Sequence, residues 1–86
     1  MNKEEVKRIL IDAVSTRIQD ELRNDLSLDL EIVPLGINSL SFIQIIVELE
    51  DGCDIEFDDD SLDFYKFRTL EDVYNYTLSK LDIENS

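Results

Sequence analysis

The segment Ser39–Asp51, SLSFIQIIVELED, is the feature that most limits how this chain can fold. Its apolar residues recur at three- and four-residue spacing, which is typical of an α-helix. Drawn at ~100° per residue, they span an arc of roughly 220°, about twice what a surface helix needs. Such a helix needs neighbours on two sides, or a partner on one. Leu40 and Val47 are expected to contact either a neighbouring helix or a partner. Ile43 is expected to face either the core or a bound apolar chain. We expect four residues in the core, namely Phe42, Ile45, Ile46 and Leu49.

Two further segments have helical periodicity. The first runs from about Asn2 to Leu22, with Asn2 in the position of an N-terminal cap. The last follows Thr69, and Asp72 three residues on completes a capping-box pattern. A short helical turn is predicted at Ser61–Tyr65. Together these segments predict an all-α fold, a small four-helix bundle with three main helices and one short helix.

The connections between these helices contain proline, glycine and polar residues. The stretch 24–37 has alternating apolar residues, but a single strand without a partner is not stable, so we interpret it as a long, partly buried loop. The middle helix is expected to begin at Asn38 or Ser39. It is expected to end at about Asp51, because the following Gly52 is a natural helix stop.

Length and composition exclude several classes of protein. A chain of 86 residues suits one domain, 1–86, with a frayed polar tail at 82–86. The chain has no histidine and one cysteine, so no metal site is expected. No signal-peptide pattern or long apolar run is present, so we expect a cytoplasmic monomer that does not insert into membranes.

Acidic residues dominate the charge of the chain. The net charge is −13, from 21 acids and 8 bases, which makes nucleic-acid binding untenable. No lysine or arginine occurs between Arg23 and Lys66, although more than half of the acids lie there. The middle of the chain therefore presents a negative field that attracts basic surfaces of partner proteins.

Ser39 lies where a loop meets the start of the middle helix. A serine nucleophile needs a base to take its proton, and this chain has no histidine, so Ser39 is not expected to be catalytic. We therefore do not expect an enzyme. The Ser39 hydroxyl can cap the helix, or it can accept a group that another enzyme attaches. The positive start of a helix favours a phosphate at such a position.

The sequence around Ser39 resembles the attachment motif of acyl and peptidyl carrier proteins. LGINSL, residues 35–40, follows the pattern Gly, any residue, Asp, Ser, Leu, with Asn38 in place of the aspartate. The surroundings agree, because a helical segment and a long loop precede the motif. An apolar helix ending in LED at 49–51, an acidic loop and FRTL at 67–70 follow it. The resemblance covers essentially the whole chain.

This resemblance implies that Ser39 accepts 4′-phosphopantetheine from coenzyme A, in a reaction catalysed by a separate phosphopantetheinyl transferase. The thiol of the arm would carry acyl or aminoacyl groups as thioesters between a loading enzyme and downstream synthase or transferase enzymes. Partners with basic patches are expected to dock weakly and fast on the helix that begins near Ser39. The expected partner interface consists of Asn38, Leu40, Ser41, Gln44, Val47 and Glu48.

Two departures from the family pattern bear on the pathway. Asn38 caps a helix as well as aspartate does but lacks its charge, which leaves the cognate transferase open. Ser41 and Gln44 stand where carriers of primary fatty-acid synthesis usually have acids. We therefore expect a specialised pathway, such as polyketide, nonribosomal peptide or another dedicated acyl or aminoacyl transfer. Because the chain begins at Met1 without flanking domains, we expect a free-standing carrier.

Two other functions share some of these features. An acidic helical module that docks a protein and carries no prosthetic group would have the same fold and charge, and Ser39 would then only begin the helix. A calcium-binding loop at 51–63 is disfavoured. Counted from Asp54, the sixth residue is Asp59 rather than glycine and the twelfth is Tyr65 rather than glutamate.

Overall fold

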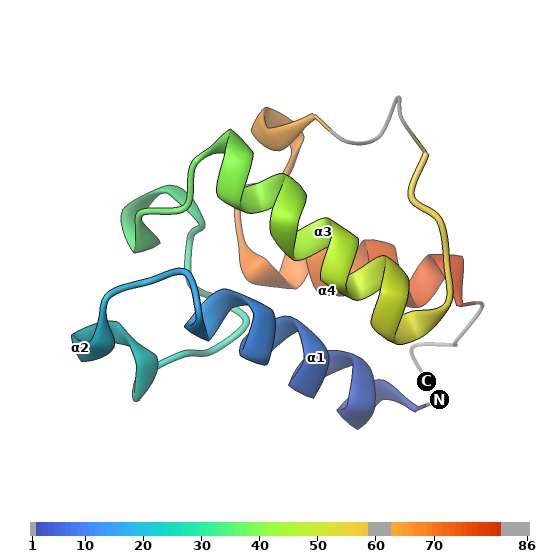
Figure 1. Cartoon of the computed structure of the whole chain (residues 1–86), viewed down its shortest axis with the longest axis horizontal. Helices are drawn as coiled ribbons and strands as arrows, with labels where there is room; N and C mark the ends of the chain where they lie inside the picture. The colour runs from blue at the N-terminus through green and yellow to red at the C-terminus, as the bar shows by residue number, and fades with distance from the viewer. Residues whose placement is uncertain (1, 59–62, 82–86) are drawn as a thin grey trace.

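Three main helices and three short elements make up the fold, which is seen in a computed structural model that describes residues 2–58 and 63–81. The main helices are α1 (Lys3–Ser15), α3 (Ser39–Cys53) and α4 (Leu70–Lys80). The short elements are helix α2 (Asp20–Arg23) and two 3₁₀ turns, η1 (Val33–Leu35) and η3 (Phe64–Lys66). Helix α1 packs against both α3 and α4 (Figure 1). The predicted all-α bundle is confirmed.

The three main helices share one apolar core. The predicted core residues of α3 are all buried, with at most 2% of each side chain exposed: Phe42, Ile45, Ile46 and Leu49. The ring of Phe42 lies 5.4 Å from that of Phe64 and 5.3 Å from that of Phe67, measured between centroids. These ring contacts fix the first turns of α3 against the segment that leads into α4.

Helix α1 is shorter than predicted, because it ends at Ser15 rather than near Leu22. Side chains at its end bond to its last carbonyl groups: the Ser15 hydroxyl donates to Asp12 O at 2.9 Å, and the Thr16 hydroxyl donates to Ala13 O at 3.1 Å. Such bonds compete with continuation of the helix. Ile18 is buried, but it lies in the turn that leads to α2.

Helix α3 runs past its predicted stop. Gly52 lies inside the helix, which ends at Cys53 with Asp54 in the left-handed conformation at φ 56°. A Cβ atom at Gly52 would lie 3.2 Å from Cδ1 and Cγ2 of Ile9. The glycine therefore permits close packing of α1 against the end of α3 and does not terminate the helix.

The predicted long loop is anchored to the start of α4. Its alternating residues form an isolated antiparallel bridge between Glu31 and Thr69. The N–H of Ile32 donates to Arg68 O at 2.9 Å, and the N–H of Leu70 donates to Leu30 O at 3.1 Å. Backbone bonds to a distant segment thus hold the loop against the start of α4.

The predicted short turn is described only in part, and the predicted tail lies outside the described residues. The predicted turn at Ser61–Tyr65 is observed as η3 from Phe64 onwards, and positions 61 and 62 lie outside the described residues. The predicted frayed tail at 82–86 also lies outside them. Among the described residues, no helix has the length and apolar character needed to cross a membrane.

Candidate functional site

The start of α3 presents Ser39 to solvent. Ser39 is the first residue of the helix and is exposed, and Asn38 is the N-cap with an extended backbone. The Asn38 side-chain oxygen accepts the N–H of Ser41 at 2.9 Å and the hydroxyl of Ser41 at 3.1 Å. The N–H of Phe42 donates to Asn38 O at 2.8 Å. Because Asn38 caps the helix, the Ser39 hydroxyl is not needed for that role.

A tight turn orients the chain as it enters α3. Gly36 ends η1 in the left-handed conformation at φ 86°, and its N–H donates to Val33 O at 3.0 Å. Apart from Gly36 and its two chain neighbours, no heavy atom of the described residues lies within 4 Å of a Cβ built at Gly36, so the backbone conformation alone requires glycine. Leu35 and Ile37 on either side are buried. These two anchors hold the turn, and Asn38 and Ser39, which follow Ile37, are exposed.

The electrostatics at this helix start suit a phosphate group. The first turn of α3 contains no acidic residue, although the chain as a whole is strongly acidic. The aligned peptide dipoles place partial positive charge at the N-terminus of the helix. An exposed hydroxyl at that end is therefore compatible with the phosphodiester of a 4′-phosphopantetheine arm.

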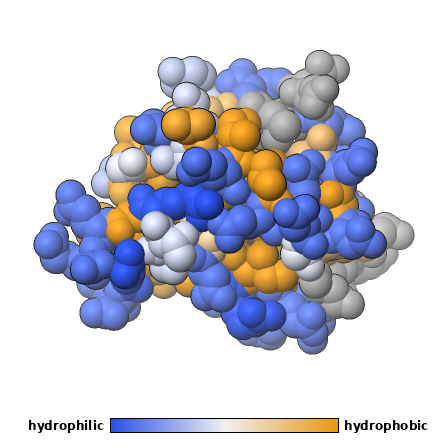
Figure 2. All heavy atoms as spheres, viewed as in Figure 1, coloured by the Kyte–Doolittle hydropathy of each residue, from blue (hydrophilic) through white to orange (hydrophobic). Residues whose placement is uncertain are grey.

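Behind Ser39, α3 exposes an apolar stripe, which we define as Leu40, Ile43 and Val47. Their exposed fractions are 69%, 40% and 46%. Figure 2 shows hydrophobic surface over the region that α3 occupies in Figure 1, bordered by hydrophilic atoms. Leu40 and Val47 thus do not contact a neighbouring helix to any large extent, and Ile43 is only partly covered. The stripe is available to a partner.

The polar residues of the predicted interface divide into two groups. Ser41 is half-buried and bonded to Asn38, whereas Gln44 and Glu48 are exposed beside the apolar stripe. Both contact Arg17, a residue that the sequence analysis did not single out. Arg17 Nε donates to Gln44 Oε1 at 3.3 Å, and its guanidinium forms an ion pair with Glu48. Gln44 is 27 positions away along the chain, so no local pattern could have revealed these contacts.

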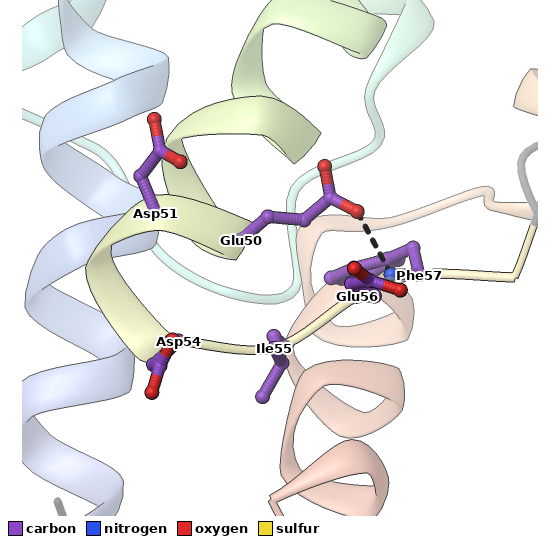
Figure 3. A pocket seen from close by; sticks show the side chains of 6 residues that line it. All are labelled: Glu50, Asp51, Asp54, Ile55, Glu56 and Phe57. Carbon is purple, nitrogen blue, oxygen red and sulfur yellow. Dashed lines mark hydrogen bonds between the residues drawn. The ribbon is translucent and has the colours of Figure 1, made fainter.

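The other end of α3 is acidic. A hollow of ≈ 640 Å³ lies there, lined by Glu50, Asp51, Asp54, Ile55, Glu56 and Phe57. The Glu50 carboxylate accepts the N–H of Phe57 at 2.9 Å. Figure 3 shows the side chains of Asp51 and Asp54 turned away from the Glu50 carboxylate. Within the described ranges, no group of three His, Cys, Asp or Glu side chains is arranged to hold a metal ion. Carboxylate residues make up most of the lining of the hollow.

Cys53 closes α3 and does not form a reactive thiol. It is buried, and its burial raises the pKa of the thiol above the usual value. The neutral thiol is therefore the dominant form at neutral pH. Cys53 serves as a small apolar residue in the core.

Comparison with known proteins assigns the chain to a family. The model of the family described as "Phosphopantetheine attachment site" matches residues 10–77. An acyl carrier protein of Syntrophobacter fumaroxidans is 31% identical over 72 residues, which cover 74% of this chain and 86% of that protein. The crystal structure of an acyl carrier protein from Thermotoga maritima has the same fold, with a TM-score of 0.75, 18% identity, and coverage of 95% of this chain and 93% of the other. The chain therefore belongs to the acyl carrier proteins, a family that bears 4′-phosphopantetheine and carries groups for enzymes without being enzymes itself.

Proposed function

We propose that Ser39 is the residue that accepts the 4′-phosphopantetheine arm. The observation that carries this proposal is the division of roles at the start of α3: Asn38 caps the helix, and the neighbouring Ser39 hydroxyl is exposed without a capping role. Ser39 also occupies the serine position of the motif LGINSL within the matched family region.

The chain's own residues hold this hydroxyl in place but do not activate it. The chain has no histidine, and the first turn of α3 has no carboxylate, so the proton of Ser39 must leave to a base of the transferase. The Ser39 oxygen forms a bond to the phosphorus that bears the pantetheine group. The P–O bond between the two linked phosphates of coenzyme A breaks, and the nucleotide leaves with the other phosphate. The role of α3 is to orient the oxygen and to favour the resulting phosphodiester through its positive end.

When attached, the arm supplies a thiol that carries acyl or aminoacyl groups as thioesters. The partner interface that we propose for the enzymes that load and use this thiol consists of Asn38, Leu40, Ser41, Gln44, Val47 and Glu48. Its support is their position on or beside the exposed face of α3.

We further propose that the chain serves a specialised pathway rather than primary fatty-acid synthesis. The support is the pair Ser41 and Gln44, which are uncharged where carriers of primary fatty-acid synthesis usually have acids. The neutral Asn38 beside Ser39 removes one more charge from the surface that the cognate transferase must recognise.

Intact mass spectrometry tests the attachment site. The chain is incubated with coenzyme A, Mg²⁺ and a broad-specificity phosphopantetheinyl transferase, and we expect a mass gain of one phosphopantetheine group. Ser39→Ala should abolish the gain. Ser79→Ala is the matched control, at an exposed serine of α4 outside the proposed interface, and should retain it.

Two outcomes count against the proposal. A gain that persists in Ser39→Ala would place the arm on another residue. A wild-type chain that stays unmodified with several transferases would leave the acidic docking module, which carries no prosthetic group, as the better description.

A further inference from the structure

We propose that Arg17 removes the charge of Glu48 from the docking face of α3, so that partner enzymes bind this face through an apolar surface rather than a basic patch. This inference rests on the proposed function, because it assumes that a partner must approach Ser39 along α3. It changes the expectation, drawn from the net charge, that basic patches dominate docking.

The contacts of Arg17 show how firmly it is held. Its guanidinium donates to Ala13 O at 2.8 Å and to the Thr16 hydroxyl at 2.8 Å, and it pairs with Glu48. The side chain of Arg17 is 22% exposed and that of Glu48 is 46% exposed. Because the bonds to the end of α1 hold the guanidinium in one place, the pair does not depend on two freely moving side chains. Glu48 therefore has a fixed positive partner within its own chain.

The position of this pair determines what a partner meets on α3. At ~100° per residue, Gln44 and Glu48 lie on one flank of the apolar stripe, on the side of Arg17. From Leu40 to Val47 the helix carries no acidic residue, and Glu48 is neutralised by Arg17. A partner lysine or arginine that approached Glu48 would be repelled by Arg17 and would have to displace it. An uncharged apolar surface meets no such penalty and can cover the stripe.

Steady-state kinetics with a broad-specificity phosphopantetheinyl transferase as the probe test this inference. The main variant is the double substitution Arg17→Gln and Glu48→Gln, which removes both charges together. We expect this double substitution to raise KM for the carrier less than either single substitution does, because a neutral pair is replaced by another neutral pair. Val47→Ser should raise KM about three-fold at unchanged kcat, because it removes apolar contact from the stripe.

The single variants sharpen the result. Arg17→Gln and Glu48→Gln should each raise KM about two- to five-fold, because each leaves one uncompensated charge beside an apolar interface. The control is Arg8→Gln, which makes the same charge change as Arg17→Gln in an exposed pair with Asp12 on α1 and should leave KM unchanged. Helical circular dichroism confirms that each variant is folded.

Docking through a basic patch predicts a different pattern, which would overturn the inference. The double variant would then raise KM several-fold because it loses the negative charge of Glu48, and Arg17→Gln alone would lower KM. A Val47→Ser variant with wild-type KM would also contradict apolar docking. All of these measurements require a wild-type chain that gains the arm, so an unmodified chain tests only the proposed function.

Discussion

The starts of α3 and α4 are both capped by a polar side chain, but their charges differ. At α4, the Thr69 side chain accepts the N–H of Asp72, and the Asp72 carboxylate accepts the N–H groups of Arg68 at 2.9 Å and Thr69 at 3.1 Å. At α3, the cap is the neutral Asn38, and the first turn contains no acid. Helix α1 resembles α4 in this respect, since Glu4 and Glu5 lie in its first turn.

This difference separates a structural helix start from one that is available for a ligand. In a chain with 21 acids, two of the three main helices place carboxylates of the chain itself at their positive ends. Only α3, among the main helices, leaves that end without a charged side chain. The start that carries Ser39 is thus the one at which an added phosphate meets the least repulsion from its own turn.

The largest expected effect is the loss of the charged cap of α4. Asp72→Ala should lower the free energy of unfolding by about 2 kcal/mol at pH 7, because two backbone N–H groups lose a charged acceptor. The matched control Glu71→Ala, in the same exposed turn, should cost less than about 0.5 kcal/mol. Urea unfolding monitored by circular dichroism measures both.

The effect of Asp72 should also depend on pH. The N–H of Arg68, followed by that of Thr69, holds the pKa of the Asp72 carboxyl below its usual value. A group with a lowered folded-state pKa stabilises fully above its unfolded pKa of about 3.9, and the contribution is lost as the pH falls through the folded value. The difference between wild type and Asp72→Ala should therefore shrink below about pH 3.9. A difference that is constant down to pH 2 would show that the carboxylate charge is not the cause.

A smaller effect is expected at the turn before α3. Gly36→Ala should cost about 1.5 kcal/mol in the free energy of unfolding, because a side chain is strained at φ 86°. Gly36→Asn should cost about half of that, since asparagine tolerates the left-handed region better. Equal losses for the two variants, measured by urea unfolding, would mean that space rather than backbone conformation requires the glycine.

The neutral cap of α3 should contribute less than the charged cap of α4. Asn38→Ala should lower the free energy of unfolding by about 1 kcal/mol through loss of its bonds to Ser41. Ser39→Ala should cost less than about 0.5 kcal/mol if Ser39 has no capping role. The reverse order in urea unfolding would assign the cap to Ser39 and remove the main support for its availability.

The smallest expected effect converts the start of α3 into one like that of α4. Asn38→Asp should stabilise the fold by about 0.5 kcal/mol at pH 7, because a carboxylate interacts favourably with the positive helix end. This gain should vanish when the aspartate is protonated. Thermal unfolding at pH 7 and pH 3 measures both values, and an equal gain at both pH values would exclude the charge as its origin.

Local sequence signals predicted the helix starts and the core of α3. Asparagine or threonine caps at Asn2, Asn38 and Thr69 are short-range features, and each one is observed. The apolar periodicity likewise identified the buried face of α3, because burial repeats with the helix turn. Features that depend on a few neighbouring residues are therefore visible in the sequence.

The features that sequence analysis missed depend on contacts between distant residues. The end of α1 was placed too late because Ile18 continues the apolar stripe, although its burial occurs in a turn. Gly52 has the local pattern of a helix stop. The reason for a glycine there is the close approach of Ile9, a residue distant in sequence. The pairing of Arg17 with Glu48 joins a turn to the far flank of α3, and nothing in either local pattern indicates it.

Tandem mass spectrometry of the transferase-treated chain tests the central claim most directly. The measurement is made on the wild-type protein, and the fragment series is read across residues 35–42. We predict that the added mass first occurs in the fragments that include Ser39 and that fragments ending at Asn38 remain unmodified. An added mass that begins at Ser41, or at any other residue, would contradict the claim that α3 offers Ser39 as its attachment point.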